Sequence, residues 1–148
     1  MSKTPTIIPG LRSPYEQVGG VYHFGRMLDK IRLNAKGQLP PDWVSAMGSP
    51  KGFDGYTCAF LHITHADLKA ETLKGGTDDE LLEWAYRTGK RPTEMEIEVW
   101  NGFMMKRSWR DKYTERLHSR LQEVGLPVGK VETMFDFIEV DEGRAPRF

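Results

Sequence analysis

Four side chains between residues 54 and 65 have the types and spacing that could bind a metal or support nucleophilic chemistry. Asp54, Cys58, His62 and His65 stand at i, i+4, i+8 and i+11. On one continuous helix they would offer carboxylate, thiolate and imidazole ligands to zinc, or a Cys–His pair for nucleophilic catalysis. However, the intervening aromatic and β-branched residues disfavour a helix, and a lone cysteine among aromatics is most often a small buried hydrophobe. We expect no metal site and keep Cys58, His62 and His65 as weak candidates.

Residues 98–116 alternate cationic and aromatic side chains, a pattern that can hold single-stranded nucleic acid. The residues concerned are Lys106, Arg107, Trp109, Arg110, Lys112 and Tyr113. Acidic residues interrupt the run, and 21 Lys and Arg in the whole chain are balanced by 21 Asp and Glu. A nucleic-acid-binding domain usually has a net positive surface instead. Nucleic-acid binding is therefore disfavoured, and the stretch is more typical of a helix junction in which Trp109 is a wedge.

A helix over residues 94–107 would direct polar groups toward the core. At about 100° per residue, Ile97, Trp100 and Met104 form its inward face, and Asn101 and Arg107 continue that face. A buried amide or guanidinium is costly unless its hydrogen bonds are satisfied. In a structural interpretation, Asn101 satisfies a loop backbone and Arg107 pairs with a carboxylate. In a functional interpretation, the same two residues form the polar floor of a binding pocket.

Two more charged residues could belong to the same site. Asp141 lies on the apolar face of a helix predicted over residues 131–142, near its C-terminus, where a carboxylate is disfavoured by about 0.3–1 kcal/mol and needs a cation. The candidate partners are Arg12, Arg32, Arg107 and Arg110. Arg32 itself borders the apolar stripe of an earlier helix. It is either an anion-binding arm or part of an ordinary solvated charged face.

Helix-start signals divide the chain into the elements that must position these residues. Thr77 and Thr93 each precede a glutamate by three residues, which is the capping-box pattern, and Ser13-Pro14 combines an N-cap residue with proline at the first helical position. Together with apolar spacing, these signals predict helices near residues 14–18, 21–35, 65–74, 78–88, 94–107, 111–124 and 131–142. Residues 36–63 are rich in Gly and Pro and are predicted to be irregular, with residues 53–63 either strand-like or a short helix.

We therefore expect an all-α fold, with a single compact domain of about six or seven helices over residues 11–148 after a flexible N-terminal tail over residues 1–10. A chain of 148 residues can bury about 68–70% of its unfolded surface without staples. Its single cysteine excludes an internal disulfide. The N-terminal residues lack the apolar run of a signal peptide, and no stretch approaches the ~18 consecutive apolar residues of a membrane span. These features predict a soluble, cytoplasmic protein without a membrane partner.

Six segments of the chain together resemble a known family. They are LRSPYEQVGG (11–20), GRMLDKIRL (25–33), GFDG (52–55), GGTDDELLEWA (75–85), GKRPTEMEIEVWNGFMMKRSWRD (89–111) and MFDFIEVDEGR (134–144). They are similar to the bacterial family Domain of Unknown Function 5069, over nearly the whole chain from Leu11 to Arg144. The resemblance implies no established activity. It does not include histidines at positions 62 and 65, and Ser108 stands where the family motif has a glycine.

The chain is thus expected to bind a small anionic ligand at a partly buried site between helices. The expected ligand-binding residues are Arg32, Trp100, Asn101, Arg107, Trp109 and Asp141. Two arginines and an amide suit a carboxylate group held by two parallel hydrogen bonds. One alternative is a small enzyme with an acid/base pair, such as Asp29 with His23 or Asp136 with a nearby cation. Another is a protein-interaction module with a purely structural polar core. The sequence identifies no cofactor, and a monomer or a homodimer is compatible with it.

Overall fold

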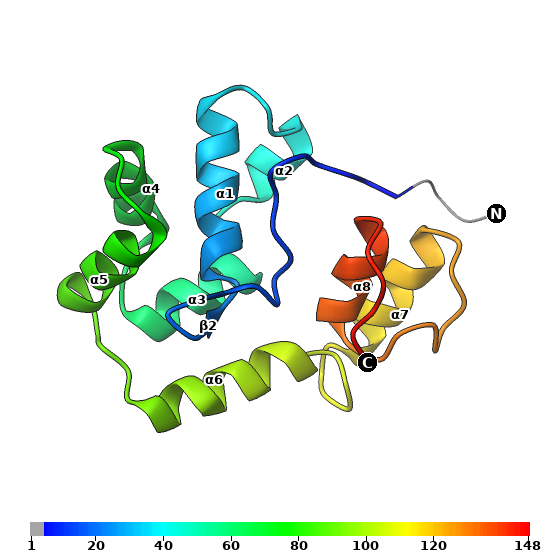
Figure 1. The fold of residues 1–148 in the computed structure, drawn as a ribbon. Coiled ribbons are helices and arrows are strands. Elements are labelled where there is room, and N and C mark those ends of the chain that lie inside the picture. The colour runs from blue at the N-terminus through cyan, green and yellow to red at the C-terminus, as the bar shows by residue number, and fades with distance from the viewer. Residues whose placement is uncertain (1–4) are drawn as a thin grey trace. The chain divides into compact units, whose positions relative to one another are not determined.

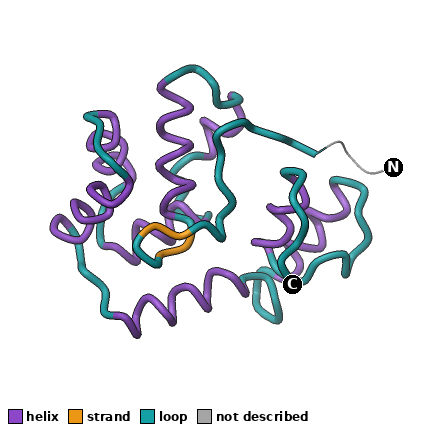
Figure 2. Tube along the Cα trace, in the orientation of Figure 1, coloured by secondary structure: helices purple, strands orange, loops and turns teal. Residues whose placement is uncertain are grey.

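A computed structural model describes residues 5–148 of the chain. With 54% helix, eight helices in the described residues and only one small sheet, the predicted all-α class is confirmed. The elements are β1 (Gln17–Val18), β2 (Val21–Tyr22), α1 (Phe24–Ala35), α2 (Pro41–Ala46), α3 (Phe53–Leu61), α4 (His65–Leu73), α5 (Asp78–Thr88), α6 (Glu94–Lys106), α7 (Thr114–Glu123) and α8 (Met134–Asp141), as Figures 1 and 2 show. None of the described helices is both long enough and apolar enough to cross a bilayer.

The chain divides into two compact units. One is Gly10–Asn101, and the other combines the described residues before Gly10 with Gly102–Phe148, so that α6 begins in the first and ends in the second. The predicted boundaries of one domain over residues 11–148 stay a prediction. Of the tail predicted over residues 1–10, the first four lie outside the described residues. Further along, the backbone N–H of Thr6 donates to the carbonyl oxygen of Asp141 over 2.7 Å.

In the Gly10–Asn101 unit, the core forms around α1, which packs against α4, α5 and β1. Its fully buried residues include Val21, Phe24, Met27, Leu28 and Ile31. The four that belong to α1 follow the helical period, as the apolar stripe of the sequence predicts. Val21 belongs to β2, so the helix predicted from residue 21 begins at Phe24 instead. Among the charged residues of α1, Arg26 is buried as well.

In the unit that contains Gly102–Phe148, α7 packs against α8. A separate apolar cluster lies here, formed by Leu117, Leu121, Val124, Val131 and Phe137. Thr133 caps the N-terminus of α8, and its side chain accepts a hydrogen bond from the backbone N–H of Asp136. The predicted start near residue 131 was therefore early by about one turn.

The helix predicted over residues 14–18 is wrong, because this segment turns into an antiparallel hairpin. Val18 pairs with Val21 across Gly19 and Gly20, which have φ values of 55° and 82°. Two consecutive residues with positive φ suit the tightest hairpin turns, and glycine adopts them without steric cost. Ser13 caps a turn instead of a helix, since its hydroxyl oxygen accepts from the backbone N–H of Tyr15. The signal that was overlooked is the Gly-Gly pair between two valines.

The segment predicted to be irregular, residues 36–63, contains two helices, α2 and α3. Residues 53–61 are helical although they are rich in aromatic and β-branched side chains, so packing outweighs their low helix propensity. Elsewhere the start signals are confirmed. The side chains of Thr77 and Thr93 each accept from the backbone N–H of the glutamate three residues later, and both glutamates reach back to the cap.

Candidate functional site

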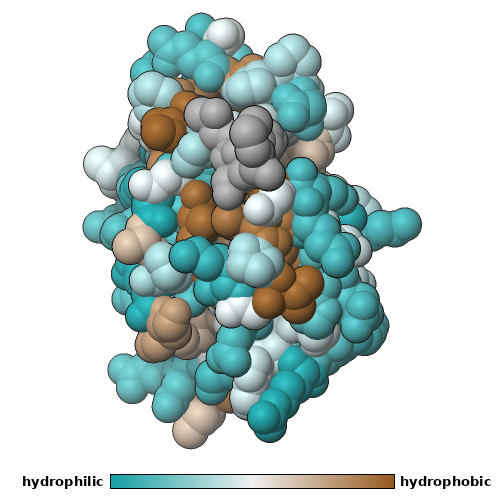
Figure 3. Space-filling model, turned by 90° about the vertical axis from the view of Figure 1, so that its right-hand side faces the viewer, coloured by the Kyte–Doolittle hydropathy of each residue, from teal (hydrophilic) through white to brown (hydrophobic). Residues whose placement is uncertain are grey.

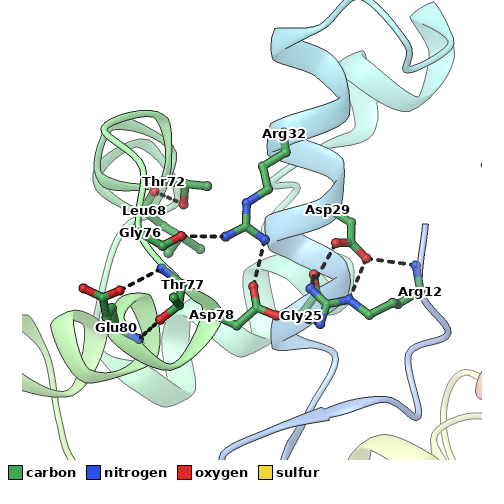
Figure 4. A network of polar contacts seen from close by, with 10 residues as sticks. All are labelled: Arg12, Gly25, Asp29, Arg32, Leu68, Thr72, Gly76, Thr77, Asp78 and Glu80. Atoms are coloured by element: carbon green, nitrogen blue, oxygen red, sulfur yellow. Dashed lines mark hydrogen bonds and ion pairs between the residues drawn. The ribbon is translucent and has the colours of Figure 1, made fainter. Parts of the chain in front are cut away.

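Helix α1 carries two clusters of charged side chains in the Gly10–Asn101 unit. The first, which we call the arginine network, consists of Arg12, Asp29, Arg32 and Asp78 (Figure 4). Arg12 contacts Asp29 over 2.9 Å and Asp78 over 2.7 Å. Arg32 contacts the other carboxylate oxygen of Asp78 over 2.7 Å and also donates to the Gly76 carbonyl oxygen. One aspartate at the start of α5 thus joins two arginines from different parts of the chain.

The charges of the arginine network are strongly coupled. Partial burial alone would raise the pKa of Asp78, but the two guanidinium groups outweigh it and hold that pKa below its usual value. The hydrogen bond to Asp29 raises the pKa of Arg12 above its usual value. Both arginines already hold a carboxylate. The network fastens the N-terminal segment and α5 to α1.

The second cluster, the Asp54 cluster, consists of His23, Lys30 and Asp54. One oxygen of Asp54 lies 2.7 Å from Nε2 of His23, and Nζ of Lys30 lies 2.7 Å from both carboxylate oxygens. The backbone N–H of Gly48 also donates to Asp54 over 2.9 Å. The aspartate and the histidine are buried. Of the acid/base pairs expected for an enzyme, Asp29 with His23 does not form, because Arg12 holds Asp29 and Asp54 holds His23.

Burial decides the protonation state of the Asp54 cluster. It lowers the pKa of His23 to about 4, although the neighbouring Asp54 acts in the opposite direction. For Asp54, burial would raise the pKa, but the positive charge of Lys30 and the bond to His23 hold it well below its usual range. At neutral pH the cluster is therefore a neutral imidazole, a carboxylate and an ammonium group.

Close packing of the backbone positions Asp54. A Cβ atom on Gly55 would lie 2.4 Å from the Cα of Pro50 and from the carbonyl oxygen of Ser49. Only a glycine at position 55 allows the two backbone segments to come this close. The close contact places Asp54 beside the turn that contains Gly48. His23 precedes α1 with φ = 73°, a conformation that is unusual for a residue other than glycine. Its Nδ1 atom is buried and has no hydrogen-bond partner.

An imidazole that is oriented by a carboxylate and has one unpaired nitrogen can serve as a general base when a substrate reaches it. In the Asp54 cluster, however, that nitrogen is fully buried. Lys30 neutralises the aspartate from the other side. The arrangement therefore has the chemistry of a buried structural ion pair more than that of a reactive centre.

Asn101, on α6, binds the backbone of a loop, as the structural interpretation of the sequence expects. Its Nδ2 group donates to the carbonyl oxygen of Gly20 over 2.7 Å, and its Oδ1 atom accepts from the backbone N–H of Tyr22 over 3.2 Å. The amide therefore holds the β1–β2 hairpin. Beside it, Trp100 is buried and stacks on Phe60 with ring centroids 4.5 Å apart.

The expected ligand-binding residues that follow α6 in the chain, Arg107, Trp109 and Asp141, lie in the unit that contains Gly102–Phe148. Arg107 contacts the carboxylate of Asp111 over 3.3 Å, and its guanidinium carbon lies 4.0 Å from the centroid of the Tyr113 ring. Trp109 is exposed, with Arg110 over its ring. Asp141 is half-buried at the end of α8. Each of these side chains therefore has its own local surroundings, and their joint role in ligand binding stays a prediction.

The cation that binds the C-terminal end of α8 is Arg144, which sequence reasoning missed. Arg144 contacts Glu139 over 3.1 Å and Glu142 over 3.0 Å, and both glutamates are buried. The sequence had suggested Arg12, Arg32, Arg107 and Arg110 as partners of Asp141, and it had not indicated this pairing of Glu139 and Glu142. An arginine just after the glycine that ends a helix is a local signal that could have been used, because the chain turns back there and returns the side chain to the last turn. Asp136 accepts from the backbone N–H groups of Arg147 and Phe148.

The weak metal candidates do not share one helix. Cys58 is buried in α3, and burial raises the pKa of its thiol to about 11. His62 follows the end of α3 with φ = 57°, and His65 begins α4. Within the part of the chain that the structure describes, no three His, Cys, Asp or Glu side chains are grouped as a metal ion would require. A thiol with a raised pKa is also a poor nucleophile.

Helix α6 exposes an apolar stripe formed by Met95, Val99 and Phe103. Their exposed fractions are 65%, 64% and 41%. These residues follow one another at intervals of four, so they lie along one face of the helix. Phe103 also has the guanidinium group of Arg107 5.2 Å from its ring centroid. This stripe, unlike the polar clusters, offers its side chains to solvent.

The sequence matches the profile of a protein family over residues 8–144, which covers nearly the whole chain and includes both charged clusters. The chain belongs to the DUF5069 family, a domain of unknown function. No curated protein matches the chain. In this DUF5069 chain, Ser108 has φ = 81°, so the serine adopts a backbone conformation that favours the glycine expected from the resemblance. Membership of this family does not by itself assign an activity to the chain.

Proposed function

We propose that this DUF5069 chain is a protein-interaction module and that the α6 stripe is its docking face. The exposure of Met95, Val99 and Phe103 along one helix face carries the proposal. A partner that covers them would remove apolar surface from water, which is favourable by about 25 cal/mol per Å². Contiguous exposed apolar residues with a polar rim are typical of interaction surfaces, whereas scattered ones are common on any protein.

The large exposed hydrophobic side chains outside α6 are arranged differently. The face drawn in Figure 3 is mainly hydrophilic, with a group of hydrophobic residues at its centre. In the described residues, the other large exposed hydrophobic side chains are Ile7, Leu73, Trp109, Val128 and Phe148. These lie at chain ends, in loops or singly on a helix, and only the α6 residues repeat at helical spacing.

The rim of the stripe indicates the chemistry of a partner. Acidic residues, among them Glu94 and Glu98, stand in the first half of α6, and Lys106 ends it. A helical surface with an apolar row and the opposite order of charges would fit both features. We therefore propose a helix as the partner element.

Binding of a small anion is the weaker proposal. An anion at Arg32 would have to displace Asp78, and an anion at Arg107 would have to displace Asp111. Each displaced carboxylate would then need a new partner or renewed hydration. The interaction module needs no such exchange, because the stripe is already exposed.

The proposal is tested by placing a photo-activatable benzophenone amino acid at position 99 and irradiating the cells that produce the protein. A discrete species heavier than one 17.0 kDa chain is expected. The matched control carries the same group at position 73, because Leu73 is also an apolar helix residue and is 50% exposed. The absence of a heavier species from position 99, or the same species from both positions, would contradict the proposal.

A further inference from the structure

We infer that the loop between α6 and α7, residues 107–113 (Figure 1), is a binding site for an acidic segment of another protein. We call it the Trp109 loop. All of its residues lie in the unit that contains Gly102–Phe148, and the inference does not depend on the α6 stripe. It follows from an exposed tryptophan, from cations without a carboxylate partner, and from a backbone held in an unusual conformation.

The loop presents an aromatic ring and a guanidinium group together. The side chain of Trp109 is 42% exposed, which is more than a wedge between two helices would be. The guanidinium carbon of Arg110 lies over this ring, 4.8 Å from its centroid. A stacked guanidinium keeps its N–H donors, which point outward in its plane, for a carboxylate. Tryptophan and arginine are also among the residue types most enriched where a few side chains dominate a protein interface.

The charge around the loop is locally unbalanced. Residues 106–116 contain five cationic residues against two acidic ones, which gives a net charge of +3, although the whole chain has none. Lys106, Arg110 and Lys112 are exposed, and within the described residues no carboxylate pairs with them. Asp111 is already bound within the loop. An incoming carboxylate would therefore displace no internal partner from these three cations.

Hydrogen bonds hold the backbone of the Trp109 loop in a conformation that costs free energy. Ser108 and Arg110, on either side of the tryptophan, have φ values of 81° and 53°, which residues other than glycine rarely adopt. The carboxylate of Asp111 imposes this turn, since it accepts from the backbone N–H groups of Ser108 over 2.9 Å and of Tyr113 over 2.8 Å. Strained backbone of this kind is concentrated at binding sites. The exposed pair is thus preorganised, so that little further ordering is needed when a partner binds.

The charge of the loop indicates the chemistry of the partner. Carboxylates of an extended acidic peptide would contact the exposed cations, and an apolar side chain between them would lie on the free part of the indole ring. Single-stranded nucleic acid would bring phosphates to the same cations, but Asp111 and Glu115 interrupt the cationic run and the whole chain lacks the net positive charge that such binding usually requires. The few contacts of one exposed loop favour a transient complex, with a Kd on the order of 100 μM.

Titration of the isotope-labelled full-length chain with an acidic peptide tests the inference by NMR. The peptide has about ten residues, mostly glutamate with one leucine, and the same peptide with glutamine in place of glutamate is the control ligand. The expected result is a shift of the indole N–H signal of Trp109 and of the backbone N–H signals of residues 107–113, with an affinity that falls as salt increases. The glutamine peptide should give no shift.

Variants of the loop and a matched control make the test specific. Arg110→Glu should weaken binding at least about tenfold, because it reverses the central charge. Arg110→Gly should weaken it about fivefold without adding strain, since glycine adopts positive φ freely. Trp109→Phe identifies the indole signal by its loss, and Trp109→Ala should weaken binding about fivefold. Arg87→Glu, at an exposed arginine of α5, is the matched control and should leave binding unchanged. Circular dichroism checks that each variant is folded.

An indole signal of Trp109 that does not shift at about 2 mM peptide, far above the expected Kd, overturns the inference. An equal loss of affinity in Arg87→Glu and Arg110→Glu overturns it too, because binding would then follow the net charge of the chain. Shifts at Met95 and Val99 in place of the loop would assign the peptide to the α6 stripe, so this inference would fail while the proposed docking face would stand. Binding of a single-stranded oligonucleotide that is lost in Arg110→Glu, with no binding of the peptide, would overturn the choice of partner.

Discussion

At the scale of single residues, the polar groups of this DUF5069 chain are mostly paired with one another. Asp54 holds His23 and Lys30, Asp78 holds Arg12 and Arg32, and a buried carboxylate is tolerated only with such partners. Removal of Lys30 would leave the charge of the buried Asp54 uncompensated, which typically costs about 3–5 kcal/mol. The Asp54 cluster is therefore a sensitive point of the fold.

The neutral buried state of His23 predicts that stability falls in weak acid. The pKa of His23 is about 4 in the folded chain, against about 6.5 in an unfolded one. Between these values the unfolded state binds more protons, so the free energy of unfolding rises with pH and falls on acidification. From pH 7 to pH 5 the expected loss from this residue is about 2 kcal/mol. Urea denaturation at the two pH values measures it.

His23→Asn is the control, because asparagine tolerates positive φ, offers an amide donor to Asp54 and does not titrate. The variant should lose much of the difference between pH 7 and pH 5. His65, whose pKa burial also lowers, acts in the same direction and is expected to leave a smaller remainder. An unchanged difference in the variant would show that His23 does not control the acid response.

At the scale of elements, short polar contacts attach segments that could not fold alone. The β1–β2 hairpin has only two residues in each strand, and isolated hairpins are marginal in water even when longer. The side chain of Asn101 provides one donor and one acceptor to its turn. Helix α6 is therefore part of the support of the hairpin.

Asn101→Ala should destabilise the chain by about 2 kcal/mol, since it removes both hydrogen bonds and leaves the turn groups to find other partners. Asn101→Asp keeps the acceptor for Tyr22 but cannot donate to the Gly20 carbonyl oxygen, so it should fall between wild type and alanine at pH 7. Urea denaturation gives both values, and hydrogen exchange at Tyr22 should accelerate in the alanine variant. A free energy of unfolding unchanged in Asn101→Ala would show that the hairpin does not depend on α6.

At the scale of the whole molecule, charge balance and two compact units are the main features. Each unit has its own buried apolar residues, around α1 in one and around Leu117, Leu121 and Phe137 in the other. The 21 cationic residues equal the 21 acidic residues. A chain without net charge has no long-range repulsion between copies, which favours self-association.

The same balance predicts that the chain does not bind nucleic acid. A labelled single-stranded oligonucleotide should show no change in fluorescence anisotropy with about 50 μM protein at 150 mM salt. Cationic contacts to phosphates would instead give binding whose affinity falls steeply as salt increases. Such a salt-dependent signal, lost in Arg110→Glu, would contradict this prediction and assign a role to the exposed Trp109–Arg110 pair.

Much of the fold could be predicted because its signals are local. The capping boxes at Thr77 and Thr93 begin α5 and α6 as expected, and the stripe of Phe24, Leu28 and Ile31 is buried. For α3 the sequence allows a strand or a helix, because its residues have low helix propensity and only their packing makes the helix stable. The hairpin at Gly19-Gly20 was missed because a coincident helix-start signal at Ser13-Pro14 was given more weight.

The sequence by itself determined the helical class, most helix positions, the absence of a strong net charge, and the types of polar residue that require partners. Only the tertiary structure decided the partners. Asp54 lies 31 residues from His23, and Asp78 lies 66 residues from Arg12, so no local period could join them. The cap of a helix depends on neighbours in the chain, whereas the pairing of a buried charge depends on which distant segments the apolar core brings together.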